Sequence, residues 1–109
     1  MKNFLGYNII MDKTLVSKFT AELLGTFAFL LVILQTTAVA NSITPLAIGI
    51  ALTSAIFMVG KISGGHFNPA VSVMMFFKNP ATFPLSMLLL YVVAQLFGGL
   101  SALFVNNQF

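Results

Sequence analysis

Few residues in this sequence could take part in chemistry, and their number limits the functions to consider. The chain holds one histidine, His66, two acids, Asp12 and Glu22, and no cysteine. This set is too small for a metal centre or a catalytic triad, and without cysteine there is neither a disulfide framework nor a thiolate metal site. We therefore expect neither an enzyme nor a bound cofactor.

The stretch SGGHFNPAVSVMMFF, residues 63–77, places bending and polar residues inside an apolar sequence. Gly64 and Gly65 permit the dihedral angles of a sharp turn. Asn68 is a favoured N-cap, and Pro69 suits the first helical position, where its missing N–H costs nothing. The helix that follows has about nine residues, or about 13 Å, which is less than half of the ~30 Å hydrocarbon layer. This pattern predicts a re-entrant half-helix that stops at mid-depth.

The chemistry open to such a half-helix is electrostatic. Its N-terminus directs free N–H groups and partial positive charge toward the bilayer centre, and the Asn68 carboxamide adds a donor if its amine points into a cavity. A permeating water would be held by its oxygen, whereas a cation, including a proton, would be repelled. The alternative is a loop folded against a neighbour, with Asn68 as a cap and no pore. The glycines, the half-length and the following apolar run together favour the pore.

Composition indicates that these residues lie in a membrane. Hydrophobic residues make up 59% of the chain and charged residues 6%, and the mean hydropathy is +1.02. Soluble domains carry about a quarter charged residues, so this chain could not cover a surface that faces water. The net charge of +3 is a topology signal and does not indicate a nucleic-acid partner.

The half-helix needs longer helices to position it, and the apolar runs predict an all-α integral membrane protein with three transmembrane helices. These are expected at about 16–37, 45–62 and 84–105, with the half-helix at 68–77, a cytoplasmic segment at 1–13 and a tail at 106–109. A rival interpretation takes the first apolar run as a signal peptide ending at Ala38–Ala40, which would give a secreted or processed product. Glu22, at the edge of the apolar run, disfavours it.

The lysines predict how the chain is oriented. Lys2, Lys13 and Lys18 precede the first transmembrane helix, while Lys61 and Lys78 flank the half-helix. Two crossings return the chain to its starting side, so all five lysines fall on one face of the membrane and none on the other. By the positive-inside rule, we expect a cytoplasmic N-terminus in the cell membrane and a C-terminus on the opposite side.

Four stretches carry a resemblance to a known family. SGGHFNPAV at 63–71 resembles the first Asn-Pro-Ala signature of the aquaporins, the major intrinsic protein family, and AELLGTF at 21–27 resembles the Glu-x-x-Gly-Thr pattern of its first helix. LAIGIALTSAIFMVGKISG at 46–64 is similar to the family's second helix, and YVVAQLFGGLSA at 91–102 to its third. The resemblance covers nearly all of residues 14–105. It implies one half of an aquaporin fold, because family channels contain two inverted halves.

The resemblance implies roles around the half-helix. Asn68, Pro69 and Ala70 would form the cytoplasmic-side half of a central asparagine constriction, which the bend at Gly64 and Gly65 positions. His66 would line the wall just inside it; the alternative is a satisfied interior group.

Two polar residues are implied to support the loop. Glu22 would be a carboxylate that accepts hydrogen bonds from the re-entrant backbone, and the alternative is an ion pair with Lys18, one turn earlier. A charge at the centre of a membrane helix costs roughly 2.5 to 3.5 kcal/mol, and less near an end, so Glu22 should face the protein interior. Gln95 would be an interior polar brace.

Two positions bear on selectivity by resemblance. Val71 stands where the family's second signature has an arginine, as in a first half, so the outer filter that contains this arginine is absent. The second-helix member of that filter would fall at Ile48, where water-strict relatives usually have an aromatic residue. An aliphatic residue favours small neutral solutes such as glycerol alongside water.

The function implied is a passive aquaporin-type channel whose pore is completed by a second half. The expected partners are the lipid bilayer and a complementary half-channel or full-length aquaporin-like subunits, with water and small neutral solutes as cargo. A non-conducting subunit or a truncated channel fragment is the alternative. An inverted homodimer is less favoured, because the lysines specify one orientation.

Overall fold

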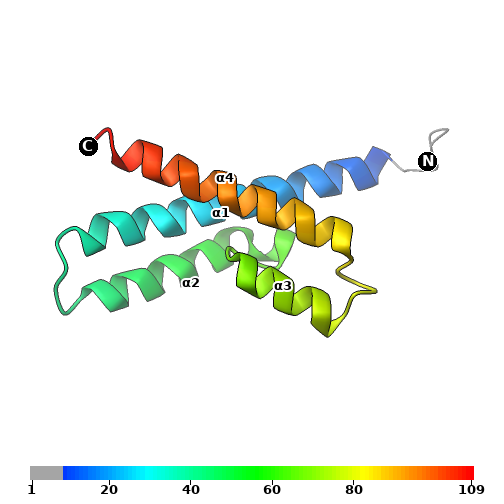
Figure 1. The fold of residues 1–109 in the computed structure, drawn as a ribbon, viewed down its shortest axis with the longest axis horizontal. Coiled ribbons are helices and arrows are strands. Elements are labelled where there is room, and N and C mark those ends of the chain that lie inside the picture. Colours follow the sequence, from blue (N-terminus) through cyan, green and yellow to red (C-terminus); the bar gives the residue numbers. More distant parts are fainter. Residues whose placement is uncertain (1–8) are drawn as a thin grey trace.

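The structure is a computed structural model that describes residues 9–109, with side chains from Lys13 onward. The described part consists of four helices and contains no strand (Figure 1). The helices are α1 (Ile9–Thr37), α2 (Thr44–Ser63), α3 (Pro69–Lys78) and α4 (Leu85–Asn106). Lys13–Thr37, α2 and α4 are each long and apolar enough to cross a membrane, whereas α3 has only 10 residues. The predicted fold class is thereby confirmed.

The helix bounds of α2, α3 and α4 shift by a single residue at each end from the expected ranges. The first helix differs more, because α1 begins at Ile9, inside the expected segment 1–13. Hydropathy marks where the chain leaves the lipid and does not mark where a helix ends. No proline or glycine interrupts residues 9–24, so the helix continues past the apolar run. Lys2 lies outside the described residues.

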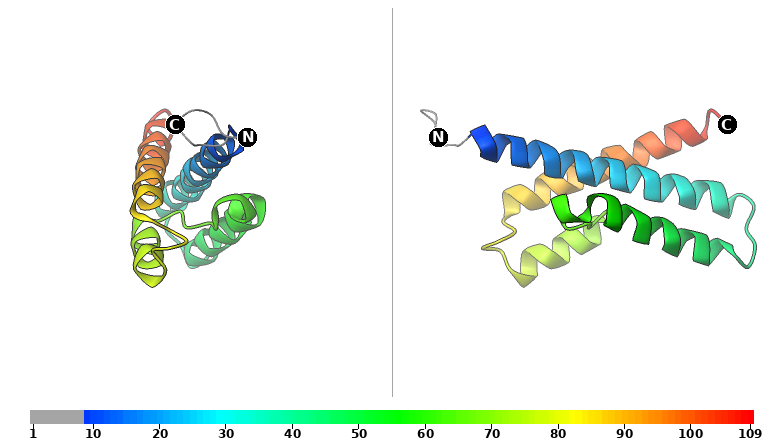
Figure 2. Two further views of the ribbon diagram at one scale, coloured as in Figure 1. Left: turned by 90° about the vertical axis from the view of Figure 1, so that its right-hand side faces the viewer. Right: turned by 180° about the vertical axis from the view of Figure 1, so that it is seen from behind.

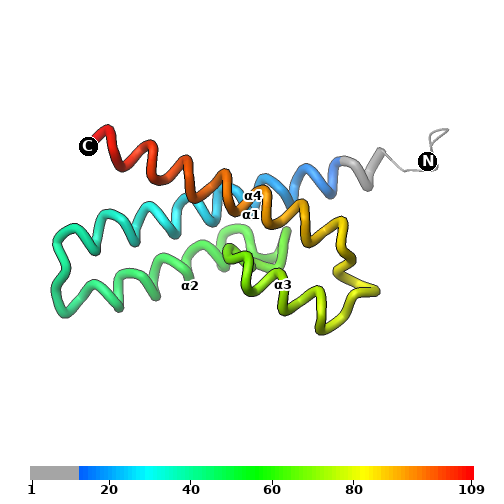
Figure 3. Tube along the Cα trace, in the orientation of Figure 1, coloured from blue at the N-terminus to red at the C-terminus, as the bar shows by residue number. Residues whose placement is uncertain are grey.

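The path of the chain gives the half-helix its position. Helices α1 and α4 run in the same direction and cross, and α2 runs back beside α1 (Figures 1 and 2). Helix α3 begins near the middle of the bundle and runs to the end where α4 starts, as the trace in Figure 3 shows. At 1.5 Å per residue its length is about 15 Å, half of the hydrocarbon layer. Packing contacts join α1 to α2, α1 to α4, and α3 to α4.

Small residues allow α1 and α4 to cross closely. Ala94, Gly98 and Ala102 recur at every fourth position, so they share one face of α4, and all three are buried. A Cβ atom at Gly98 would lie 2.6 Å from the backbone oxygen of Leu23. A side chain at this position would therefore separate the two helices, which is the usual reason for glycine at membrane helix crossings.

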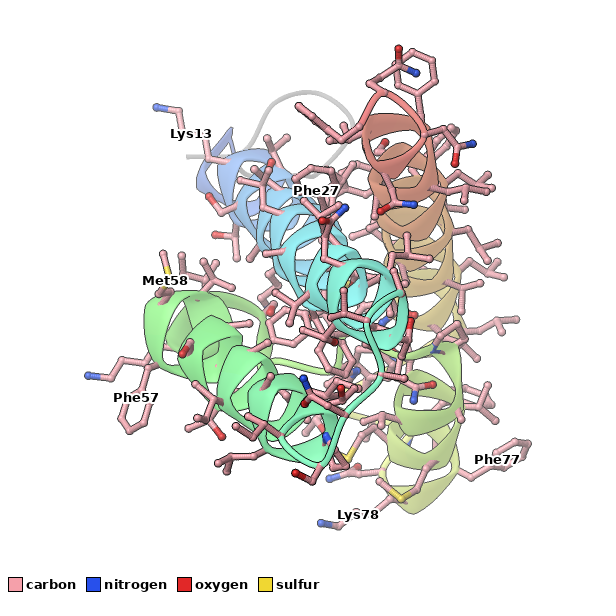
Figure 4. The ribbon with its side chains drawn as sticks, turned by 90° about the vertical axis from the view of Figure 1, so that its left-hand side faces the viewer. Lys13, Phe27, Phe57, Met58, Phe77 and Lys78 are labelled. Carbon is pink, nitrogen blue, oxygen red and sulfur yellow. The ribbon has the colours of Figure 1, made fainter. Side chains whose placement is uncertain are left out.

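Large apolar side chains cover much of the outside of the bundle. Phe57, Met58 and Phe77 are 83%, 80% and 76% exposed, and Figure 4 shows Phe57 and Phe77 pointing away from the bundle on opposite sides. Soluble proteins rarely expose contiguous apolar patches of this kind. The outward side chains therefore suit contact with lipid or with another membrane protein.

Candidate functional site at the re-entrant loop

The loop between α2 and α3 reverses the chain through three residues with positive φ. Gly64 has φ +93° and Gly65 has φ +66°, and the N–H of Gly64 caps α2 by donating to the oxygen of Gly60 at 2.7 Å. These angles lie in the left-handed region that glycine adopts at little cost. The predicted bend is therefore where the two glycines allow it.

Phe67 completes the turn and is held in a strained conformation. Its φ is +53°, although it is not a glycine, and such backbone costs roughly 1 to 2 kcal/mol per residue. The N–H of Phe67 donates to Glu22 Oε1 at 2.8 Å, and its ring is buried against Gly25, where a Cβ atom would lie 2.0 Å from the ring. The hydrogen bond and the packing offset the strain.

Glu22 is the acceptor on which the loop converges. Its side chain is fully buried. Oε2 accepts from Ser63 Oγ at 2.7 Å and from the N–H of His66 at 3.1 Å, while Oε1 accepts from the N–H of Phe67 and from Gln95 Nε2 at 2.9 Å. Ionised carboxylates have only acceptor sites, and four donors use them here. Two of the donors are backbone groups of the loop, as the resemblance implies. Among the described residues, Glu22 forms no ion pair with Lys18.

Ser72 and Tyr91 extend this polar network to α3 and α4. Ser72 Oγ, fully buried, accepts from Gln95 Nε2 at 2.9 Å and lies 2.8 Å from His66 Nδ1. The Tyr91 hydroxyl donates to the Ser63 carbonyl at 2.5 Å. Sequence reasoning missed the roles of Ser63, Ser72 and Tyr91, because an isolated serine or tyrosine in an apolar helix gives no signal of what it will face.

His66 occupies the interior position that the sequence left open as an alternative. Its side chain is 9% exposed, Nδ1 pairs with Ser72, and its ring centre lies 5.0 Å from that of Phe83 and 4.9 Å from that of Tyr91. Within the described chain the ring is therefore held by its Nδ1 hydrogen bond and by its two aromatic contacts. A place on the wall of a completed pore stays a prediction.

Asn68 caps α3 and presents a donor at the N-terminal end of the half-helix. Its Oδ1 accepts from the N–H of Ala70 at 2.8 Å, and its backbone oxygen accepts from the N–H of Ser72 at 3.1 Å. Because the cap fixes Oδ1 toward the backbone, the amide Nδ2 is the end that points outward from an exposed side chain. Pro69 has no N–H and that of Ala70 is used by the cap, so among the described residues the N–H of Val71 is the free donor of this first turn.

Beside Asn68, a groove of about 690 Å³ runs between α1 and α4. Most of its lining is apolar. Thr26, Asn68 and Gln95 are its polar members, and Pro69 lies next to Asn68 at the start of α3. The apolar wall consists of Phe29, Leu30, Ile33 and Leu34 from α1, Phe67 from the loop, and Leu96, Gly99, Leu100 and Leu103 from α4.

Comparison with known proteins decides the family. The family described as Major intrinsic protein matches residues 10–108. This chain belongs to the major intrinsic protein family. Its match is wider than the 14–105 that the motifs suggest.

Several relatives illustrate the similarity to this major intrinsic protein. Nodulin-26 from Glycine max is 46% identical over 66 residues, which is 55% of this chain and 24% of the relative. Glycerol uptake facilitator protein-like 6 from Lactiplantibacillus plantarum is 35% identical over 88 residues, 78% of this chain and 40% of the relative. Aquaporin Z from Photorhabdus laumondii is 32% identical over 101 residues, 81% of this chain and 41% of the relative. No solved structure gives a significant match.

The chain thus spans less than half the length of the curated relatives it matches. Within this member of the major intrinsic protein family, the structure brings Asn68, Pro69 and Gln95 to one groove. It does not bring Ile48 or Val71 there: Ile48 is half-buried near the start of α2, and Val71 is half-buried in the first turn of α3. If Ile48 and Val71 influence selectivity, they do so beside another protein segment and not in this groove.

Proposed function

We propose that this chain is one half of an aquaporin-type channel that passes water, and small neutral solutes such as glycerol, through a pore completed by a second half. The observation that supports this most directly is the position of Asn68. Its amide and the N-terminus of α3 offer donors near the middle of the helix bundle, beside an open groove.

The donors explain which species the site would favour. A water molecule or hydroxyl group at Asn68 would accept hydrogen bonds through its oxygen. The partial positive charge at the end of α3, roughly half an elementary charge, would repel a cation at the same place. Transport would be passive, because the site offers orientation and no chemistry, in agreement with a family of channels rather than enzymes.

The need for a second half follows from the depth that α3 covers. The half-helix packs beside α4 and is about half as long as the hydrocarbon layer is thick, and beyond its N-terminus the space between α1 and α4 is the open groove. A pore with one wall missing would admit lipid. The share of each relative that this chain spans, 24% to 41%, supports a complementary part.

The charges support one orientation in the cell membrane, with a cytoplasmic N-terminus. Lys13 and Lys18 lie in the first part of α1, while Lys61 and Lys78 lie in the last turns of α2 and α3. These helix ends share one end of the bundle (Figure 1). The far end carries no lysine within the described residues.

The second candidate is a non-conducting subunit that associates with full-length channels. The outward face of α2, where Phe57 and Met58 are largely exposed, offers a surface for such association. The two candidates differ in whether Asn68 affects permeation.

An osmotic assay tests the proposal. The chain would be reconstituted in vesicles alone, and together with the part of the Lactiplantibacillus plantarum relative that lies outside the match. Stopped-flow light scattering would report the rate of shrinkage. We expect the chain alone to match empty vesicles, and the pair to exceed them severalfold.

The Asn68→Ser variant provides the test of the site. Serine retains an N-cap hydroxyl, so α3 should still form, but the amide donor is lost. We expect reduced water permeability in the reconstituted pair. Equal permeability of the variant and the wild type, or no permeability of the pair at all, would contradict the proposed function.

A further inference from the structure

We propose that Ser72 is a positioning residue that sets the proton of the neutral His66 ring on Nε2. The loop between α2 and α3 then offers a hydrogen-bond donor in addition to the amide of Asn68. This donor would take an acceptor group, the oxygen of a water molecule or of a hydroxyl group. The role of Ser72 follows from contacts within this chain, and only the occupant of Nε2 rests on the proposed function.

Gln95 fixes the direction of the Ser72 hydroxyl. The Nε2 atom of Gln95 donates one proton to Glu22 Oε1 and the other to Ser72 Oγ, both at 2.9 Å. An ionised carboxylate only accepts, so a reversed amide would place two acceptors against each other at Glu22. Ser72 Oγ therefore accepts from Gln95, and its own proton needs a different acceptor.

His66 Nδ1 is the acceptor that this proton meets. It lies 2.8 Å from Ser72 Oγ, and the Ser72 side chain bonds to no described residue other than His66 and Gln95. A proton on Nδ1 would place two donors against Oγ and leave the hydroxyl proton of a fully buried serine without an acceptor. Nδ1 is therefore bare, and the neutral ring carries its proton on Nε2.

The opposite orientation of the ring would not serve Ser72. A ring turned over about its bond to Cβ would place Cδ2–H against Oγ and offer no acceptor. The ring is also held in place by packing, because its centre lies 5.0 Å from that of Phe83 and 4.9 Å from that of Tyr91. The hydrogen bonds and the packing therefore support one ring orientation and one tautomer.

Nε2 is the open side of the ring. It makes no hydrogen bond to a described residue. The side-chain polar atoms of this part of the chain that are both buried and without a partner are Thr26 Oγ1 and Gln95 Oε1, so Nε2 reaches the surface. It does so beside Gly64, where a Cβ atom would lie 3.5 Å from Nε2. The exposed 9% of His66 therefore includes its free donor.

The tautomer decides which species this surface can bind. A protonated Nε2 donates, so it suits an oxygen with a free lone pair, as in water or an alcohol. The other tautomer would present a bare nitrogen, which accepts a proton or binds a metal cation. Ser72 thereby makes the open side of His66 a donor, like the Asn68 amide.

Nitrogen NMR of the whole chain in lipid bilayers tests the role of Ser72. The sequence has one histidine, so ¹⁵N-labelled histidine gives two ring signals, which their couplings to the ring C–H protons assign. At mildly alkaline pH, where the ring is neutral, we expect the proton on Nε2 and an Nδ1 signal that its hydrogen bond moves upfield. A wild-type ring with its proton on Nδ1 would overturn the proposal.

Variants of Ser72 separate positioning from packing. Ser72→Ala removes the donor to Nδ1, so the Nδ1 signal should move downfield, whereas Ser72→Thr keeps the hydroxyl and should keep the wild-type signal. Ser54→Ala removes an exposed hydroxyl from α2 and should change neither signal. An unchanged Nδ1 signal in folded Ser72→Ala would refute the proposal, and the wild-type spectrum decides alone if this variant does not fold.

The osmotic assay gives an independent outcome. A proton on Nδ1 would refute the role of Ser72 and leave the half-channel intact. A reconstituted pair without permeability would refute the half-channel and remove the proposed occupant of Nε2, but it would leave the tautomer as the spectrum shows it.

Discussion

Glu22 shows how one residue can determine the shape of a loop. Its two oxygens accept from the loop backbone at His66 and Phe67, from Ser63 at the end of α2 and from Gln95 on α4. A carboxylate is needed because every neighbour is a donor. The price of burying a charge is offset by four hydrogen bonds rather than by a counter-ion.

Replacing Glu22 with glutamine should destabilise the fold. The new amide would present a donor to at least one of the four donors, so we expect Glu22→Gln to lower the free energy of unfolding by about 3 kcal/mol. Detergent-induced unfolding followed by circular dichroism would measure it. The reverse exchange at an exposed site, Gln108→Glu, should change stability by about 0.5 kcal/mol or less. Equal effects of the two exchanges would contradict the role assigned to Glu22.

Gly25 is required by the ring of Phe67, and two glycine variants can show this. A Cβ atom at Gly25 would overlap the ring, whereas a Cβ atom at Gly49 would meet nothing within 4 Å. We expect Gly25→Ala to destabilise the fold by about 1 to 3 kcal/mol. Gly49→Ala should be neutral or stabilise it by up to about 1 kcal/mol, because alanine favours a helix. The same unfolding assay would compare them, and a stable Gly25→Ala variant would mean that Phe67 has another position available.

At the scale of the helices, the crossing of α1 and α4 forms the groove and positions the residues that line it. Thr26 and Gln95 face one groove because these helices approach closely at Gly98. Helix α3 depends on this crossing, since its packing contacts are with α4. The half-helix is therefore supported from one side, and its depth is fixed by α4 and by the loop network.

Two neighbouring glycines on α4 provide a test at this scale. A Cβ atom at Gly98 would meet the Leu23 backbone at 2.6 Å, whereas one at Gly99 would meet the end of the Leu30 side chain at 3.0 Å. Backbone cannot yield as a side chain can, so Gly98→Ala should destabilise the fold by about 2 kcal/mol, and Gly99→Ala by less than about 1 kcal/mol. Crosslinking between cysteines placed on α1 and α4 should fall for Gly98→Ala alone. A similar loss in both variants would argue against a backbone contact.

For the whole molecule, charge distribution and helix direction support the single orientation proposed above. The described lysines gather at one end of the bundle, where α1 starts and α2 and α3 end. The three long helices cross the bundle in alternating directions, so the start of α1 and the end of α4 lie at opposite ends. An inverted pair of identical chains would need the opposite balance of charge in half of the copies.

A reporter fused after Phe109 would test this topology. We expect activity on a single face of the membrane, opposite to that of a reporter placed before Met1. Changing Asn107 and Gln108 to lysine should weaken the bias and give a mixed signal, because positive charge would then flank both ends. Equal signals from both faces in the wild type would contradict the single orientation and restore the inverted homodimer.

The sequence by itself determined the membrane environment, the three long helices and the half-helix. Each depends on local properties: apolar length, the glycines at 64 and 65, and an N-cap followed by proline at Asn68 and Pro69. The motifs also indicated the family. The start of α1 differs from the predicted one, because hydropathy does not report a helix that continues into the aqueous interface.

Only the tertiary structure decided which polar groups meet. Glu22, Ser72 and Gln95 lie far apart in the sequence and come together through the crossing of α1 and α4 and the return of the loop. The same packing turned His66 toward Tyr91, and it buried Thr26 Oγ1 and Gln95 Oε1 without a hydrogen-bond partner among the described residues. Hydrogen bonds are short-ranged and directional, so the partner of a buried polar atom follows from how the helices pack and not from its own neighbours in the chain.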